Sequence, residues 1–159
     1  MMFSSLLKPE NIILELESSE KDVLFAEMVE NIVTTHPSVN RSEALVALTE
    51  RENKMNTCIK SGIAVPHASC ASVTYPVVSI GISRGGIDYE VEGGAAPDSK
   101  ESLVHLVIMI LFEQGNTERH LHILAECAHI LQTPAFYQTA LTASSASEII
   151  EKLRRIEEV

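Results

Sequence analysis

The sequence predicts a fold that combines helices with a sheet, of the α/β or α+β class, built as one domain over residues 1–159. Residues 103–112 are apolar on both faces apart from His105, which is typical of a central strand covered by helices on each side. Segments with the helical spacing of apolar residues lie before and after this strand. With 159 residues and 45% hydrophobic content, the chain can close one core of ordinary size, and a second independent domain is not expected.

Two helices are predicted in the first third of the chain, after a short strand. Apolar residues recur at every second position over residues 12–16, a pattern typical of a half-buried strand. A helix then begins after Ser19 with an acidic first turn, and its apolar pattern ends at His36 and the proline that follows. Asn40, with Glu43 three residues later, forms a capping-box-like start for the second helix.

The middle of the chain is predicted to be less regular. Periodicity fails over residues 55–71, so we expect an irregular segment apart from a short apolar patch at residues 63–65, and such loops often carry function. Residues 77–83 are rich in β-branched side chains and predict a strand, which the Arg-Gly-Gly sequence at 84–86 would end. Residues 88–102 combine adjacent glycines, a proline and several charges, and we expect a surface segment there.

Three helices are predicted in the last third of the chain. Thr117 is the expected cap of the first of them. Thr133 and Pro134 occupy the cap and first helical positions of a shorter helix. Ser145, with Glu148 three residues later, caps the last one. The apolar stripe of the first of these helices is expected to consist of Leu121, Leu124, Ala125, Ala128 and Leu131.

Charge and hydropathy exclude several classes of protein. Twelve Lys and Arg against 22 Asp and Glu give a net charge of −10, which repels a nucleic-acid backbone and fits either solubility or docking onto a basic protein. Residues 1–12 hold no apolar run typical of a secretory signal. The longest apolar run, residues 106–112, is far short of the ~20 residues that a membrane span needs. We therefore expect a cytoplasmic protein without membrane insertion and without a nucleic-acid partner.

The three cysteines are predicted to be packing residues. Cys58, Cys70 and Cys127 form no CxxC pair, which argues against a disulfide framework or structural zinc. A thiol nucleophile is disfavoured because Cys70 lies only three residues from His67, too close for a base that normally approaches from a separate segment. Signatures for nucleotide binding and serine hydrolysis (GxxxxGK[ST], GxGxxG, GxSxG) are absent from the sequence.

The stretch GIAVPHA, residues 62–68, is the first candidate for chemistry. Gly62 permits a tight backbone approach, and Pro66 fixes the backbone before His67 while lacking the N–H that a continuing strand would need. We therefore expect His67 at a strand end, rigidly held and accessible. The competing interpretation is an incidental loop histidine, which is the more frequent origin of an isolated Pro-His pair.

Arg51 and a group of histidines are further candidates. The guanidinium of Arg51, at a helix end, can hold phosphoryl or carboxylate oxygens in two-pronged geometry, or can simply interact with the last helical carbonyls. His120 lies near the edge of the predicted apolar stripe, whereas His122 and His129 share the outer face with Glu126. The HExxH spacing of a metal site is absent, so solvated surface histidines are favoured over a metal site.

Residues 50–68 (ERENKMNTCIKSGIAVPHA) and 118–131 (ERHLHILAECAHIL) together resemble the fructose/mannitol-type enzyme IIA domain of the bacterial phosphoenolpyruvate-dependent sugar phosphotransferase system. The specific elements are an Arg-Glu pair, a Thr, a Gly-Ile-Ala-x-Pro-His stretch and a later His-Leu-x-x-Leu on a helix, in that order. The resemblance extends over residues 7–153. His120 and His122 in one HLH stretch of a free-standing chain are also similar to the nitrogen-regulatory branch of this family.

This resemblance implies a fold, a reaction and a set of site residues. The fold would be α/β, with roughly five strands in a mixed sheet between helices. His67 would be the phosphorylated histidine, which receives the group from phospho-HPr and passes it on. Arg51 and His120 match the positions around it, and Thr57 and Gly62 match phosphoryl-binding positions. No metal or cofactor is expected.

The sequence departs from the family pattern at three places. Lys60 and Ser61 stand where the family usually has a further Gly, and Asn56 precedes Thr57 where the family has Ser. Residues 90–102 are longer than the usual turn, which can alter the choice of partner. None of these changes removes a residue that the chemistry needs.

Imidazole suits a phosphoryl relay because its ordinary pKa of about 6.5 leaves a neutral, nucleophilic nitrogen at neutral pH. We expect a backbone carbonyl to hold Nδ1 of His67, which leaves Nε2 for attack. Two functions remain open: a phosphocarrier that passes the group to a sugar-specific IIB component, and a purely regulatory module of the nitrogen type that binds a regulatory protein. A metal-dependent hydrolase is a third, less favoured hypothesis.

Overall fold

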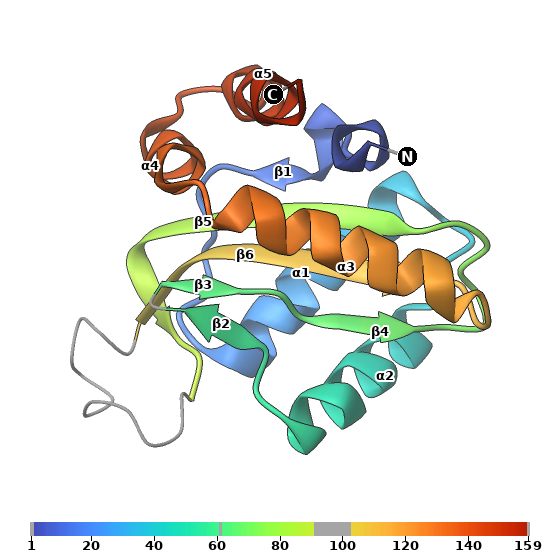
Figure 1. Cartoon of the computed structure of the whole chain (residues 1–159). Helices are drawn as coiled ribbons and strands as arrows, with labels where there is room; N and C mark the ends of the chain where they lie inside the picture. The colour runs from blue at the N-terminus through green and yellow to red at the C-terminus, as the bar shows by residue number, and fades with distance from the viewer. Residues whose placement is uncertain (1, 61, 91–102, 159) are drawn as a thin grey trace.

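Strand β6 (Leu103–Phe112) is the centre of a mixed sheet in the computed structural model, which describes residues 2–60, 62–90 and 103–158 (Figure 1). It pairs antiparallel with β5 (Val77–Asp88) and parallel with β3 (Ile63–Ala64) and β4 (His67–Ser69). Beyond these, β1 (Ile12–Ile13) adds to β5 and β2 (Cys58–Lys60) adds to β3. The sheet has six strands rather than roughly five, because β3 and β4 pair with successive parts of β6.

The helices form two layers, one on each face of the sheet (Figure 1). The layer that contains α1 and α2 lies on one face, and the layer that contains α3, α4 and α5 lies on the other. Two short 3-10 helices at the N-terminus pack beside the second layer. The helices are η1 (Phe3–Leu6), η2 (Pro9–Asn11), α1 (Lys21–Thr35), α2 (Arg41–Lys54), α3 (Thr117–Leu131), α4 (Pro134–Thr142) and α5 (Ala146–Glu157).

The side chains of β6 alternate between the two hydrophobic cores, as the pleat of a strand requires. Leu106, Ile108 and Ile110 belong to the core under α3, α4 and α5, whereas Val107 and Met109 belong to the core under α1 and α2. All five are fully buried. The prediction of a central strand covered on both faces is therefore confirmed, and its apolar run is explained by the two helical layers.

Most of the predictions of helix ends were correct. The Asn40 side chain accepts a hydrogen bond from the backbone N–H of Glu43 at 2.9 Å, and Ser145 caps α5 in the same way. Pro134 begins α4 as predicted. The first helix begins one residue later than expected, since its cap position is held by Glu20, without a side-chain hydrogen bond.

Three predictions about strands were wrong. Residues 55–71 are not irregular but contain β2, β3 and β4, whose two or three residues are too short to show a period of two. Strand β5 does not end at Ser83, because a register shift between Ile82 and Ile87 absorbs the Arg-Gly-Gly sequence and the strand continues. Of residues 12–16, only the first two form β1.

The predicted buried stripe of α3 was correct for Leu131, which is buried, and for Leu124, which packs against the core, but wrong for its other three residues. Leu121 is 63% exposed, and Ala125 and Ala128 also lie on the exposed side. Apolar residues cover a wider arc of this helix than the sheet can bury, so periodicity alone did not define the packed face. Thr117 is the first helical residue, and the cap position is held by Asn116 with a φ of 51°. The buried residues of α3 are Ile123, Cys127, Ile130 and Leu131.

Two further expectations concern the surface of the molecule. Of the surface segment predicted over residues 88–102, residues 91–102 lie outside the described part of the chain. Among the described residues, no helix combines the length and the apolar character that a membrane crossing demands.

Candidate functional site

A pocket of about 300 Å³ opens at the edge of the sheet, where β4 runs between α2 and α3 (Figure 1). Residues from both helices and from two strands line it, although they are far apart in the sequence. The volume is sufficient for a phosphoryl group together with part of the side chain that carries it. The charged, imidazole and aromatic lining residues are Glu50, Arg51, Lys54, His67, Phe112 and His120.

The local sequence explains how His67 reaches this pocket. The carbonyl of Pro66 accepts a hydrogen bond from the Ile110 N–H at 3.0 Å, and His67 then begins β4, as expected for a residue at a strand end. In the parallel ladder His67 is paired with Ile110, whose side chain lies in the core under α3. His67 therefore lies on the α3 side of the sheet, while the next residue, Ala68, is buried on the opposite side.

The ring of His67 is half-buried, and one of its nitrogens is fixed. Nδ1 lies 2.8 Å from the carbonyl oxygen of Val65. A carbonyl can only accept, so Nδ1 carries the proton and Nε2 keeps its lone pair. Burial lowers the pKa of His67, the Val65 hydrogen bond opposes this effect, and the charge of Arg51 lowers the pKa further. The neutral, nucleophilic form is thereby favoured at neutral pH.

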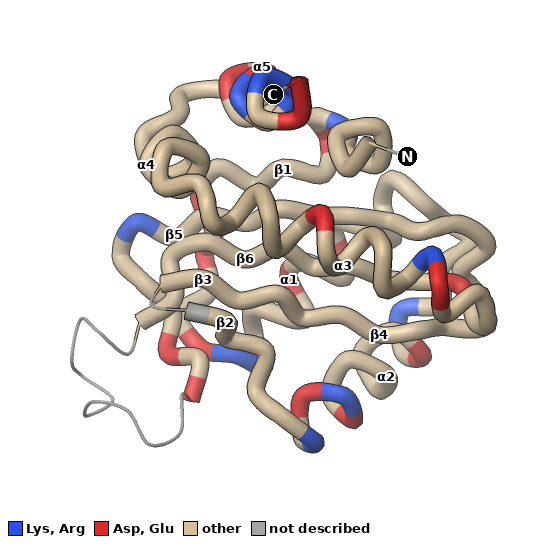
Figure 2. The backbone as a smooth tube through the Cα atoms, in the orientation of Figure 1, with Lys and Arg blue, Asp and Glu red and all other residues tan. Residues whose placement is uncertain are grey.

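Arg51 and Lys54 bring positive charge to the pocket from the last turns of α2. Figure 2 shows basic and acidic residues interspersed along this end of the helix. The Nη1 atom of Arg51 donates to the carbonyl oxygen of Met55 at 3.0 Å. Arg51 therefore satisfies both interpretations of the sequence, because it caps a helix end and also lines the pocket.

His120 reaches the same pocket from α3 and packs against an aromatic neighbour. Its ring is stacked on Phe112, with centroids 4.2 Å apart and planes at 19°. Phe112 also meets the ring of His67 edge-on at 6.4 Å. One phenyl ring therefore contacts both imidazoles. In contrast, His122 is exposed beside Glu126, as predicted for the outer face of the helix.

Thr57 does not lie in the pocket, which corrects the sequence prediction. It is 4% exposed, and its hydroxyl donates to Glu52 Oε1 at 2.7 Å and lies 2.7 Å from the hydroxyl of Tyr89. Its backbone N–H donates to Glu52 Oε2 at 2.8 Å. The hydroxyl is thus enclosed in a buried network behind α2, and Thr57 is absent from the pocket lining.

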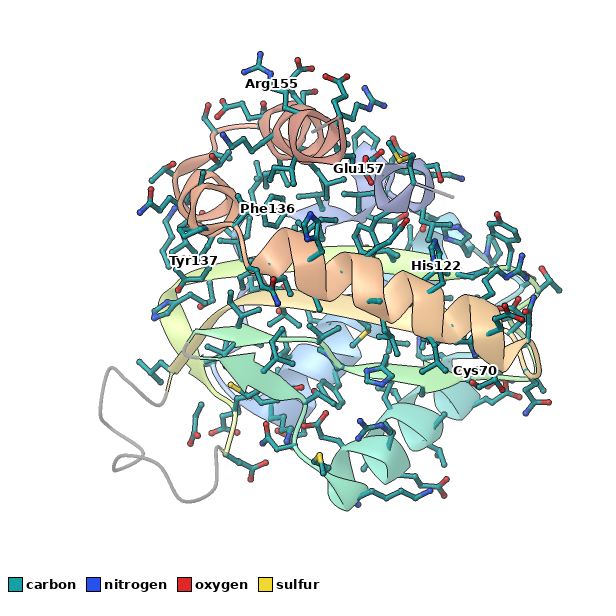
Figure 3. The ribbon with its side chains drawn as sticks, in the orientation of Figure 1. Cys70, His122, Phe136, Tyr137, Arg155 and Glu157 are labelled. Atoms are coloured by element: carbon teal, nitrogen blue, oxygen red, sulfur yellow. The ribbon has the colours of Figure 1, made fainter. Side chains whose placement is uncertain are left out.

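Gly62 does not line the pocket either, and its role is steric. Its φ of +84° favours glycine, and an added Cβ would lie 2.5 Å from the hydroxyl of Tyr137, on α4 (Figure 3). Its carbonyl accepts hydrogen bonds from the N–H groups of His105 and Leu106 at 2.8 and 3.0 Å. Gly62 therefore supports the entry into β3 instead of binding a phosphoryl group.

Phe112 lines the pocket and Glu113 contacts the lining residue His120, and the sequence prediction named neither of them. Phe112 ends an apolar run and Glu113 is the next residue, a position that says nothing about what either side chain contacts. Glu113 is 9% exposed and accepts hydrogen bonds from Arg119 and from Nε2 of His120. The only sequence signal was a carboxylate directly after a buried strand and seven residues before a histidine.

Two of the cysteines are packing residues, as predicted. Cys70 and Cys127 are each 1% exposed, and Cys70 is labelled in Figure 3. Burial raises the pKa of Cys70 to about 11 and that of Cys127 to about 12, so both remain thiols at neutral pH. Within residues 2–60, 62–90 and 103–158, no group of three or more His, Cys, Asp or Glu side chains could hold a metal ion.

Comparisons with known sequences point to one family. The family model described as "Phosphoenolpyruvate-dependent sugar phosphotransferase system, EIIA 2" matches residues 5–156. The fructose-specific EIIABC component of Bacillus subtilis is 33% identical over 95% of the chain, which spans only 23% of that relative. The fructose-specific EIIA component of Haloferax volcanii is 33% identical over 75% of the chain and 73% of its own length.

Comparisons with solved structures agree with the fold. The nitrogen regulatory protein IIA-Ntr of Neisseria meningitidis superposes with a TM-score of 0.82 at 23% identity, covering 94% of this chain and 97% of the other. The complex of IIA mannitol with phosphorylated IIB mannitol from Escherichia coli gives a TM-score of 0.75 at 21% identity, covering 94% and 97%. At these identities the likeness shows a shared α/β architecture.

Proposed function

This chain belongs to the EIIA 2 family of the phosphoenolpyruvate-dependent sugar phosphotransferase system, whose members are phosphotransferases with a phosphohistidine intermediate, and we propose that His67 is the histidine that carries the phosphoryl group. The observation that supports this assignment is the fixed ring of His67. Its Nδ1 is held by the Val65 carbonyl, while Nε2 keeps a lone pair in a pocket that also contains Arg51.

The proposed transfer is an in-line displacement between two histidines. Nε2 of His67 attacks the phosphorus of phospho-HPr, a new N–P bond forms, and the N–P bond of the donor breaks. The electron pair of the broken bond stays on the donor imidazole, which takes up a proton. Charge develops on the three equatorial oxygens, and Arg51 and His120 supply donors for them. Positioning and electrostatic stabilisation are the main contributions of the protein.

The next acceptor is proposed to be a IIB component of a fructose-type sugar system. Two relatives at 33% identity are named fructose-specific, and one of them combines EIIA with B and C components in a single chain. A solved relative of the same fold is a complex of IIA mannitol with phosphorylated IIB mannitol. We also propose a cytoplasmic location, where a soluble donor such as HPr is accessible.

The purely regulatory alternative is not favoured. Its support from the comparisons is the likeness to IIA-Ntr of Neisseria meningitidis, which at 23% identity concerns the fold alone. The HLH stretch at residues 120–122 adds little to it, because His122 is an exposed residue paired with Glu126 on the outside of α3.

The proposal is tested by labelling with phosphoenolpyruvate, enzyme I and HPr. We expect one acid-labile phosphoryl group per chain, located on His67 by mass spectrometry. The His67→Gln variant should take up none, because Gln cannot form the N–P bond. His122→Gln is the matched control and should be labelled like the unmodified protein. An unchanged label on the His67→Gln protein would overturn the assignment.

A further inference from the structure

We propose that Glu113 is a positioning residue for phosphoryl transfer, which fixes the ring of His120 so that Nδ1 is the nitrogen left to act in the pocket. The inference rests on the proposed function of His67. Glu113 directly follows the last residue of β6, and it is absent from the pocket lining. It therefore acts through His120 rather than on the phosphoryl group.

Both oxygens of the Glu113 carboxylate are engaged. Oε1 lies 3.1 Å from Nε2 of His120, and Oε2 accepts a hydrogen bond from Arg119. Burial opposes ionisation, but the hydrogen bonds from Arg119, the backbone and His120 lower the pKa of Glu113 below its usual value. The group is therefore a carboxylate at neutral pH and can only accept, so Nε2 of His120 carries a proton.

A second contact fixes the plane of the same ring. His120 is stacked on Phe112, which is 2% exposed and forms the end of β6. Stacking sets the plane of the imidazole, and the carboxylate sets its rotation within that plane. The side chain of His120 is only 12% exposed, so few other orientations are open to it. The last residue of β6 and the residue that follows it thus determine where both ring nitrogens lie.

This arrangement has a chemical consequence for the pocket. In the doubly protonated form of the ring, Nδ1 also carries a proton while Nε2–H still donates to the carboxylate. Nδ1–H of His120 can then donate to an equatorial oxygen of the phosphoryl group while His67 is attacking. Arg119 pairs with the other oxygen of the carboxylate, so both oxygens are engaged away from the phosphoryl group.

Helix α3 also contains a second histidine–glutamate pair, which lies outside the His67 pocket. His122 and Glu126 lie 3.2 Å apart, but their side chains are 58% and 28% exposed. Figure 3 shows His122 on the side of α3 away from β4, and a separate hollow there is shared with Ile156 and Glu157 of α5. This pair has the same chemistry as His120 and Glu113, so it serves as the control for removing a carboxylate from a histidine on α3.

The test compares Glu113→Gln with Glu126→Gln in single-turnover transfer from phospho-HPr. Gln retains the size of the side chain and removes the charge. We expect Glu113→Gln to slow transfer by at least about tenfold while His67 remains the labelled residue, and Glu126→Gln to change nothing. In a His120→Gln background, Glu113→Gln should cause no further slowing, because its effect passes through His120.

Three outcomes would overturn this inference. The first is a Glu113→Gln protein that transfers as fast as the unmodified protein, and the second is the same loss with and without His120. The ring ¹⁵N signals of His120 provide a readout that needs no transfer: they should change in Glu113→Gln and stay the same in Glu126→Gln, and unchanged signals in Glu113→Gln would also refute the proposal. Absence of any label on His67 in the unmodified protein would instead refute the proposed function.

Discussion

Arg51 and Glu52 are neighbours in α2, but their side chains belong to opposite sides of the helix. Arg51 lines the pocket and, among the described residues, makes one hydrogen bond, to the Met55 carbonyl. The side chain of Glu52 is 5% exposed and faces the interior, where it contacts α1, the residue after β5 and the segment after α2. Arg51 therefore belongs to a polar surface, and Glu52 belongs to a buried polar network.

The buried network is saturated with partners. Glu52 forms an ion pair with Lys21 at 2.8 Å, accepts from Thr57 through both of its oxygens, and accepts from the Tyr89 hydroxyl at 3.2 Å. Lys21 also lies over the ring of Tyr89, 4.4 Å from its centroid. Polar groups that are fully satisfied by one another hold elements together and leave nothing for a ligand.

The pocket has the opposite character. Nε2 of His67 keeps a lone pair that its backbone contact does not use, and Arg51 has guanidinium nitrogens beyond the one directed at Met55. Groups of this kind are available to an incoming phosphoryl group. Both clusters contain cations and hydrogen-bonding side chains, and they meet at adjacent residues of α2. What distinguishes the structural cluster from the reactive one is therefore whether its polar groups already have hydrogen-bond partners.

The largest effect expected on stability is that of Glu52→Ala. Removal of the carboxylate leaves the ammonium of Lys21, whose side chain is only 12% exposed, without its ion-pair partner, and loss of one partner of a buried pair costs about 3–5 kcal/mol in the free energy of unfolding. Urea denaturation followed by circular dichroism measures this loss. A change below about 1 kcal/mol would show that the network does not hold the fold together.

Arg51→Ala is the matched control for that measurement. We expect its unfolding free energy to stay within about 0.5 kcal/mol of the unmodified protein, as for surface substitutions, and its transfer rate to fall by about 10²-fold because a charge donor to the phosphoryl oxygens is lost. A severe loss of stability in Arg51→Ala, with an unchanged transfer rate, would show that Arg51 stabilises the fold and does not act in transfer.

Local signals were readable from the sequence, whereas contacts made by the fold were not. The caps at Asn40 and Ser145 depend on residues three positions away, and the place of His67 at a strand end depends on the adjacent Pro66. These predictions were confirmed. Strands of two or three residues escaped prediction because their pairing with β6 stabilises them, not their own periodicity.

The site prediction failed for residues whose surroundings are set by contacts with distant parts of the sequence. Thr57 was assigned to the phosphoryl group by family resemblance, yet it is enclosed by Glu52 and by Tyr89, which lies 32 residues away. Glu113 was hidden at the end of an apolar run, because its role follows from the return of α3 over the sheet. His67, Arg51 and His120 were correctly predicted to come together in one pocket.

Thr57→Val tests the corrected role of Thr57 and has an intermediate expected effect. Valine has a similar shape but no hydroxyl, so Glu52 Oε1 loses one donor and the Tyr89 hydroxyl loses a partner. We expect a loss of about 1–3 kcal/mol in unfolding free energy and a transfer rate within about twofold of the unmodified protein. A tenfold slower transfer with unchanged stability would return Thr57 to the phosphoryl site.

The smallest effect expected, and the sharpest test of the comparison, concerns the pKa of His67. Burial lowers this pKa, the charge of Arg51 lowers it too, and the charge of Glu52 raises it. Arg51→Gln should therefore raise the pKa of His67 and Glu52→Gln should lower it, as measured by NMR titration of the ring protons.

Because the native pKa lies below that of the unfolded chain, His67 supports stability above about pH 6.5 and this support is lost as the pH falls through the native pKa. Arg51→Gln should reduce that acid sensitivity and Glu52→Gln should increase it. A His67 pKa that is unchanged in both variants would mean that burial alone controls this ring. The charge of Arg51 would then have no effect on the pKa of His67, and the two sides of α2 would not differ in their electrostatic influence on the pocket.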